Sequence, residues 1–241
     1  MAAKLNVGKV LLGAFLVPWW NRRVFLRTLW MPFVALTVVD WLSKQLGGPL
    51  GWGAVWGLII SFPIFVVFVV LCHRLVLLDV GAQDFRSFPT WSWRETRFAL
   101  LAFGLALVCV IVMVAMAAVL SMLPLWNGER PLDHWPKYLA ALPAYYVFAR
   151  TSLVLPATAV DRRVNFAWAW RQTDGNGWRL VVVVGALPFF LSQAVDLIYR
   201  SGATVLQTLM VGVLVGALTS LLTIVEVAAR SLSYKELGAN E

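Results

Sequence analysis

The residues that could carry acid–base chemistry recur in two matching segments of the chain. Asp84 and Asp161 occupy equivalent places in segments related by an offset of 77 residues. Paired carboxylates can act as general acid and general base, but a repeated segment explains this pair without catalysis. The sequence contains no nucleophile elbow, zinc-protease motif or glycine-rich phosphate loop. It therefore predicts no catalytic residue and a non-enzymatic protein.

Metal and cofactor chemistry are not indicated either. His73 and His134 are 61 positions apart and lack the clustered set of Cys, His and carboxylate groups that holds a metal. Cys72 and Cys109 lie in apolar runs, where cysteine packs as a small hydrophobic residue. We expect no metal site, no cofactor and no disulfide.

The two matching segments are typical of a membrane interface. Residues 78–96 and 155–173 share eight identities in 19 ungapped positions, and each contains a Trp-x-Trp-Arg motif. Its rings suit the headgroup layer, and its arginines can meet anionic lipids or a partner protein, although simple anchoring of the chain also explains the motif. We call these segments elbows. The candidate elbow residues are Asp84, Arg86, Trp91, Trp93, Arg94, Asp161, Arg163, Trp168, Trp170 and Arg171.

Each elbow is predicted to form a short helix that lies in the interface. In the second copy Asn165 is a good N-cap and Gly175 a good C-terminal stop. In the first copy Pro89 suits the first helical turn. Asp161 is expected to pair locally with Arg163 or to clamp the chain ahead of the helix.

The composition indicates a membrane protein, and interfacial helices require a membrane. Hydrophobic residues make up 61% of the 241 residues and charged residues only 13%, and the mean hydropathy is +0.79. A soluble domain of this size buries about two-thirds of the surface that its unfolded chain exposes, which is too little for so apolar a chain. The composition predicts an integral membrane protein. It excludes a soluble enzyme, a disordered chain and a nucleic-acid-binding domain.

Six segments have the length of a membrane-spanning helix, roughly 20 residues. We predict them at 24–43, 53–75, 98–122, 136–157, 179–199 and 203–228. The predicted fold is all-α: one transmembrane domain over 1–241, with six helices arranged as three hairpins and a short interfacial helix ahead of each. The internal repeat units are about 1–80, 81–157 and 158–235.

The basic residues predict how the helices are oriented. Sixteen of the 20 Lys and Arg residues fall on the side that holds both termini and the connections between hairpins. Because cytoplasmic connections carry such an excess, we predict a multi-pass protein of a bacterial inner membrane with both termini in the cytoplasm. Segment 3–20 is too short to span and is expected to lie in the interface.

Two charged residues within or near predicted spans are candidate intramembrane polar groups. Arg150 is the most deeply placed basic residue, and we expect it to snorkel to the interface or to pair with Glu226 or Asp161. Glu226 also precedes Arg230 by four residues, a spacing that favours an ion pair.

Small residues and prolines suggest how the spans pack. Gly212 and Gly216 form a Gly-x-x-x-Gly motif, which we interpret as a close-packing face. Four prolines fall inside predicted spans, where they allow kinks. They are Pro32, Pro63, Pro143 and Pro188.

The segment 149–188 resembles the signature region of a group of bacterial six-helix inner-membrane proteins. The group includes YciC-like proteins and the membrane domain joined to some glycerophosphodiester phosphodiesterases. The resemblance rests on Arg150, Leu155-Pro156-Ala157, Asp161, the run AWAWRQT at 167–173 and Gly175-Asn176-Gly177-Trp178-Arg179. It implies a six-helix membrane fold, and it carries over no activity and no catalytic residue.

Together these patterns predict an accessory, assembly or lipid-organising component with a basic, Trp-rich cytoplasmic face. The expected partners are anionic membrane lipids or another membrane protein, and not nucleic acid. The alternative is a small transporter or channel with a path among the kinked helices.

Overall fold

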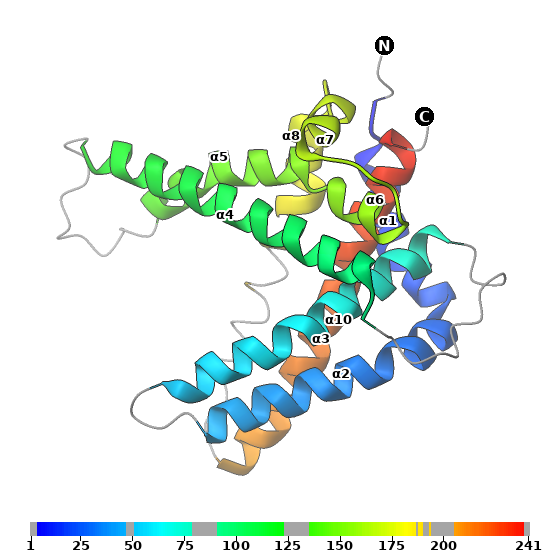
Figure 1. Ribbon diagram of the computed structural model, residues 1–241, viewed down its shortest axis with the longest axis vertical. Coiled ribbons are helices and arrows are strands. Elements are labelled where there is room, and N and C mark those ends of the chain that lie inside the picture. The colour runs from blue at the N-terminus through cyan, green and yellow to red at the C-terminus, as the bar shows by residue number, and fades with distance from the viewer. Residues whose placement is uncertain are drawn as a thin grey trace.

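The computed structural model describes residues 4–46, 51–78, 91–122, 135–186, 188–189, 193 and 205–238. The regular elements in these ranges are helices and none is a strand, which confirms the all-α prediction (Figure 1). They are α1 (Val7–Trp20), α2 (Arg22–Gln45), α3 (Trp52–Leu77), α4 (Trp93–Ser121), α5 (Trp135–Thr151), α6 (Val154–Ala159), α7 (Phe166–Gln172), α8 (Gly177–Leu180), the π-helix η1 (Val181–Ala186) and α10 (Val205–Leu237).

Three of the described helices are long and apolar enough to cross a membrane. They are Arg22–Ser43 within α2, Val55–Leu77 within α3, and Trp93–Ser121, which is α4. These stretches match the first three predicted spans. Large apolar side chains such as Leu100, Phe103 and Ile111 are exposed along α4. Exposed apolar helices of this length are typical of a membrane protein, because lipid tails are as apolar as the side chains they meet.

The fourth predicted span, 136–157, is not one helix. Helix α5 ends at Thr151, and α6 begins at Val154 after a short turn. Pro156 explains the break, because it has no N–H and its ring would clash with the carbonyl of Ser152 in a continuous helix. All six residues of α6 are buried, so this segment packs inside the protein.

The fifth and sixth predicted spans have different boundaries from those expected. The described beginning of the fifth consists of α8 and the π-helix η1, and most of the remainder to residue 204 lies outside the described residues. The sixth was expected to end at residue 228, whereas α10 continues to Leu237.

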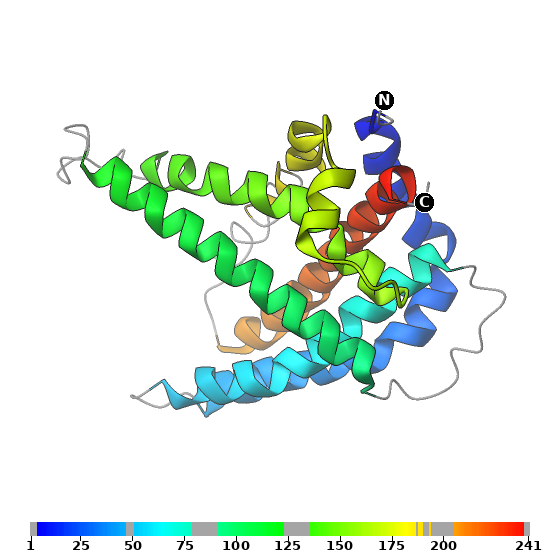
Figure 2. The ribbon, with the colours of Figure 1, turned by 45° about the horizontal axis from the view of Figure 1, so that its top comes forward.

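Both termini and the shortest helices gather at one end of the molecule, which we call the hub. The hub comprises α1, α6, α7, α8, the C-terminal ends of α3, α5 and α10, and the first turns of α2 and α4 (Figure 1). Helices α2 and α3 lie side by side and extend away from it, as do α4 and α5, and the two pairs diverge (Figure 2). Helix α10 packs against α3 and α1.

The most deeply buried residues lie in the hub, and many of them are small. They are fully buried and contributed by α5, α6, α7 and α10: Ala149, Ala157, Ala159, Ala169, Ala228 and Ala229. Small side chains let helix backbones approach closely, so the short helices pack tightly within the apolar core.

The packing face predicted at Gly212 and Gly216 stays a prediction, and a closer helix contact lies at another glycine. A Cβ at Gly216 would lie 3.9 Å from Thr37 Oγ1, which is ordinary contact, and the surroundings of Gly212 lie outside the described residues. A Cβ at Gly57 would lie 2.5 Å from Ser43 Cβ. The tight contact between α2 and α3 is therefore at Gly57.

Candidate functional site

The described part of the first elbow begins helix α4 instead of forming a separate short helix. Trp91 and Ser92 are not helical, and α4 starts at Trp93. Ser92 and Glu95 form a capping box, in which the Glu95 carboxylate accepts a hydrogen bond from Ser92 N at 2.8 Å. The predicted helix around Trp91 is therefore wrong, because the capping box starts the helix two residues later.

The second elbow forms the short helix that was predicted. Asn165 Oδ1 accepts a hydrogen bond from Trp168 N at 2.9 Å and caps α7. Gly175, just beyond the end of α7, has a φ of 72°, which glycine adopts without strain. The N-cap and the stop are both confirmed. The two copies differ because Ser92 corresponds to Ala169, which cannot cap a helix.

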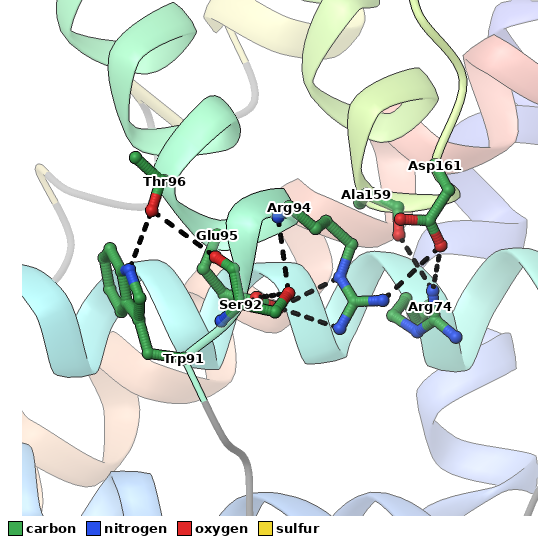
Figure 3. A network of polar contacts seen from close by, with 8 residues as sticks. All are labelled: Arg74, Trp91, Ser92, Arg94, Glu95, Thr96, Ala159 and Asp161. Carbon is green, nitrogen blue, oxygen red and sulfur yellow. Dashed lines mark hydrogen bonds and ion pairs between the residues drawn. The ribbon is translucent and has the colours of Figure 1, made fainter.

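Asp161 joins three elements through two arginines (Figure 3). Its Oδ2 accepts hydrogen bonds from Arg74 Nη1 at 3.1 Å and from Arg94 Nη1 at 3.4 Å. Arg74 Nη1 also donates to Ala159 O, and Arg94 pairs with Glu95 at 2.9 Å. We call this group the Asp161 clamp. Of the two alternatives expected for Asp161, the local pair with Arg163 is wrong. Asp161 is a clamp ahead of α7, and it joins the end of α3 and the start of α4 to the turn after α6.

Arg150 holds α7 against the end of α5. Its side chain is almost fully buried, with 7% exposure. Its Nε donates to Thr173 Oγ1 at 3.1 Å and its Nη2 to Trp170 O at 2.6 Å. The guanidinium lies 4.0 Å from the centre of the Trp170 ring, a cation–π distance.

The ion-pair partner of Arg150 is Asp174, at 3.4 Å. The expected pairs with Glu226 and Asp161 are wrong, because the chain turns back after α5 and brings the end of α7 beside it. Glu226 pairs with Arg230 at 3.4 Å, as its spacing predicted.

The candidate elbow residues therefore fall into distinct groups. The exposed ones are Trp91, Trp93, Arg163, Trp170 and Arg171. Arg94 and Asp161 belong to the clamp, and Trp168 packs with its ring centre 6.3 Å from that of Tyr234. Asp84 and Arg86 lie outside the described residues.

Further exposed tryptophans and arginines lie in α1, α2 and α8. Trp19 and Trp20 at the end of α1 are 65% and 69% exposed, and Trp178 in α8 is 66% exposed. Arg22 and Arg23 at the start of α2 are exposed too. We call Trp19, Trp20, Arg22, Arg23, Trp93, Arg163, Trp170, Arg171 and Trp178 the exposed hub residues.

The N-terminus is held by contacts that the sequence did not predict. Leu5 N donates to Asn176 Oδ1 at 2.9 Å, and Arg179 Nη1 donates to Leu5 O at 3.3 Å. Lys9 pairs with Glu236 at 3.4 Å. We call these contacts the N-terminal latch. The run Asp174-Gly175-Asn176-Gly177 signals a turn, but nothing in its spacing indicates that it binds residue 5.

Within the described ranges, no group of three or more His, Cys, Asp or Glu side chains is placed to hold a metal ion. In the part of the chain that the structure describes, the fold and the site thus define an all-helical protein with three helices long and apolar enough to cross a membrane and a polar, tryptophan-rich end. No family model, curated protein or solved structure matches the chain. The functional assignment therefore rests on the residues and contacts described above.

Proposed function

We propose that this protein is a non-enzymatic component of a bacterial inner membrane whose hub binds anionic lipid headgroups. It would serve as an accessory, assembly or lipid-organising factor, with a partner membrane protein as a second possible contact of the same face. One observation carries the proposal: the exposed hub residues combine tryptophans with arginines, whereas Trp41, Trp52 and Trp56, which are exposed at the other end of α2 and α3, have no arginine near them in the chain.

The proposed topology places the hub at the cytoplasmic surface. Six membrane-spanning helices form three hairpins, each preceded by a short interfacial helix. The gathering of basic residues on the hub supports this orientation, because cytoplasmic surfaces carry the excess of Lys and Arg. The 14-residue helix α1 is too short to cross and suits the interface.

The chemistry of the exposed hub residues fits anionic headgroups. An indole ring has an apolar body and a polar N–H, so it prefers the headgroup layer. A basic residue near an anionic leaflet contributes about 1 kcal/mol. Arg163 and Arg171 are exposed and therefore free to reach phosphates, whereas Arg94 and Arg150 are held by Asp161 and Asp174.

Replacing Arg163 and Arg171 together with Gln should weaken the retention of anionic lipids. We expect a loss of about 2 kcal/mol, or roughly 30-fold in affinity, because two cations are removed from the headgroup layer. Native mass spectrometry after extraction in gentle detergent measures the lipids that stay bound.

The matched control is Lys44→Gln, near the end of α2 that points away from the hub. It should leave retention unchanged. Unchanged retention in the double arginine variant would contradict the proposal, as would a protein purified with neither lipid nor partner.

A small transporter or channel is the second candidate, because Pro32, Pro63 and Pro143 lie inside α2, α3 and α5. Prolines free carbonyls and allow the kinks that a path or gate uses. Solute flux in reconstituted vesicles would favour this function over lipid organisation.

A further inference from the structure

Asp174 is a surface carboxylate of the hub that the proposed contacts with anionic lipids do not use. It lies in the turn after α7, and its side chain is 82% exposed. Its Oδ1 pairs with Arg150 Nη2 at 3.4 Å. Among the residues that the structure describes, no other hydrogen bond or ion pair reaches this carboxylate. Because a carboxylate has about four lone-pair sites, most of its capacity to accept hydrogen bonds is open to a ligand.

Three aromatic rings lie around the arginine that holds this carboxylate. The Arg150 guanidinium lies 4.0 Å from the centre of the Trp170 ring and 6.0 Å from that of Tyr146. The Tyr146 ring centre lies in turn 5.1 Å from that of Trp178 and 6.2 Å from that of Trp170. The end of α5 and the turn between α7 and α8 thus bring Asp174 and two exposed indoles to one place on the hub.

Arg150 is held too firmly to be the ligand-binding group itself. Its side chain is buried, and it donates to Thr173 Oγ1 at 3.1 Å and to Trp170 O at 2.6 Å. Its contact with Asp174 is longer, at 3.4 Å, and uses one of the two carboxylate oxygens. Arg150 therefore orients the carboxylate and leaves its exposed side to an incoming group.

The chemistry of this place favours a ligand that carries a positive charge. A carboxylate repels the phosphate of an anionic lipid and attracts an ammonium group, whose N–H donors form charge-assisted hydrogen bonds. The faces of indole rings also attract cations. Such a ligand can carry a phosphate as well, because Arg171 is exposed and lies three residues before Asp174. Asp174 N donates to Arg171 O at 3.2 Å, so the arginine and the carboxylate belong to one turn.

We infer that Asp174 binds the primary ammonium group of a zwitterionic phospholipid headgroup, with the Trp178 ring beside it and the phosphate directed to Arg171. The inference rests on the proposed function, since Arg171 is one of the exposed hub residues. It adds a preference among lipids that have no net charge, which the exposed arginines alone do not provide.

Two lipids that differ only at the ammonium group test this site on the full-length protein. Phosphatidylethanolamine and phosphatidylcholine have the same phosphate and no net charge, but the three methyl groups of choline remove the N–H donors. Native mass spectrometry measures which lipid stays bound after exposure to equal amounts with identical acyl chains. We expect roughly two- to fivefold more phosphatidylethanolamine, the range that an exposed ion pair supports. Equal retention of the two lipids would overturn the inference.

Replacing Asp174 with Asn should abolish the preference for phosphatidylethanolamine. Arg150 keeps its hydrogen bonds to Thr173 and Trp170 in this variant, so the hub should stay folded. The matched control is Asp161→Asn, which removes the same charge from another exposed carboxylate of the hub and should preserve the preference. A preference that survived in Asp174→Asn, or that Asp161→Asn removed equally, would show that Asp174 is not the binding group.

The failure of this inference can be told apart from the failure of the proposed function. A protein that retains phosphatidylglycerol but does not distinguish phosphatidylethanolamine from phosphatidylcholine would overturn the inference alone. A protein that retains none of the three lipids would overturn both. The comparison of lipids on the unsubstituted protein gives this answer even if Asp174→Asn fails to fold.

Discussion

Asp161 is the residue on which arginines from two helices converge. Its carboxylate accepts hydrogen bonds from Arg74 of α3 and Arg94 of α4, and its backbone has a φ of 64°. The left-handed conformation costs most residues roughly 1–2 kcal/mol, and Asn and Asp visit it more readily than other non-glycine residues. One residue thus supplies both the charge of the clamp and the turn that presents it.

Replacing Asp161 with Asn and with Ala should separate these two roles. Because the carboxylate is more than half exposed, Asp161→Asn should lower the free energy of unfolding by about 0.4–2 kcal/mol, the worth of two exposed ion pairs. Asp161→Ala should lose about 1 kcal/mol more, since alanine resists the left-handed backbone. Unfolding in mixed micelles, followed by circular dichroism, measures both losses. Equal losses would contradict a role for the backbone conformation.

Arg150 should not tolerate replacement by Lys. An ammonium cannot stack on the Trp170 ring while it also bonds to Thr173 and to the Trp170 carbonyl. We expect Arg150→Lys to lower the free energy of unfolding by about 2–4 kcal/mol. The matched control, Arg171→Lys, changes an exposed arginine and should stay within about 0.5 kcal/mol. Similar small losses in both variants would show that charge alone matters at Arg150.

At the scale of the helices, the sequence predicts a boundary best where a capping residue marks it. Asn165 begins α7 as expected, because capping is a local property of a few residues. The capping-box signature Ser92-x-x-Glu95 is also present in the sequence. The repeat nevertheless favoured the same short helix in both elbows. The break before Pro156 was missed because the apolar run continues through it, and hydropathy carries no information about the lost hydrogen bond.

The packing of α2 on α3 depends on the absence of a side chain at Gly57. Gly57→Ala should lower the free energy of unfolding by about 1–3 kcal/mol, because its Cβ would meet Ser43 Cβ at 2.5 Å. Gly104→Ala in α4 is the matched control. Its Cβ would lie 3.7 Å from the Phe166 ring, so the better helix propensity of alanine should leave the protein unchanged or up to about 1 kcal/mol more stable.

A second substitution tests the cause of the loss at Gly57. Ser43→Gly removes the Cβ that Gly57→Ala would meet, so the double variant should recover most of the stability, apart from the helix propensity that glycine costs, about 1 kcal/mol. No recovery would show that the clash is not with Ser43. Thermal unfolding in detergent compares the unsubstituted protein, Gly57→Ala, Ser43→Gly and the double variant.

At the scale of the whole molecule, the ion pairs that join segments far apart in the sequence lie at one end, among the residues that the structure describes. The Asp161 clamp, the contacts of Arg150 and the N-terminal latch all join segments of the hub. The sequence indicated such an end through its distribution of basic residues. It could not indicate the pairs themselves, since Asp174 reaches Arg150 and Asn176 reaches Leu5 only after the chain has turned back on itself.

Labelling of single cysteines should locate the hub relative to the membrane. In a background with Cys72 and Cys109 replaced by Ala, Arg163→Cys should react with a membrane-impermeant maleimide only after the cells are opened, because the proposed topology places it in the cytoplasm. Asn127→Cys, in a predicted outer connection, should react in intact cells. The reverse pattern would invert the topology, and labelling of both in intact cells would contradict the spans between them.

The N-terminal latch has a consequence for the order of assembly. Leu5 is made early, but Asn176, which accepts the hydrogen bond from its N–H, follows 171 residues later, and Glu236, which pairs with Lys9, comes close to the end of the chain. During synthesis, helix α1 leaves the ribosome long before these partners exist. Its docking must therefore come late, so that a docked α1 shows that α10 is already in place.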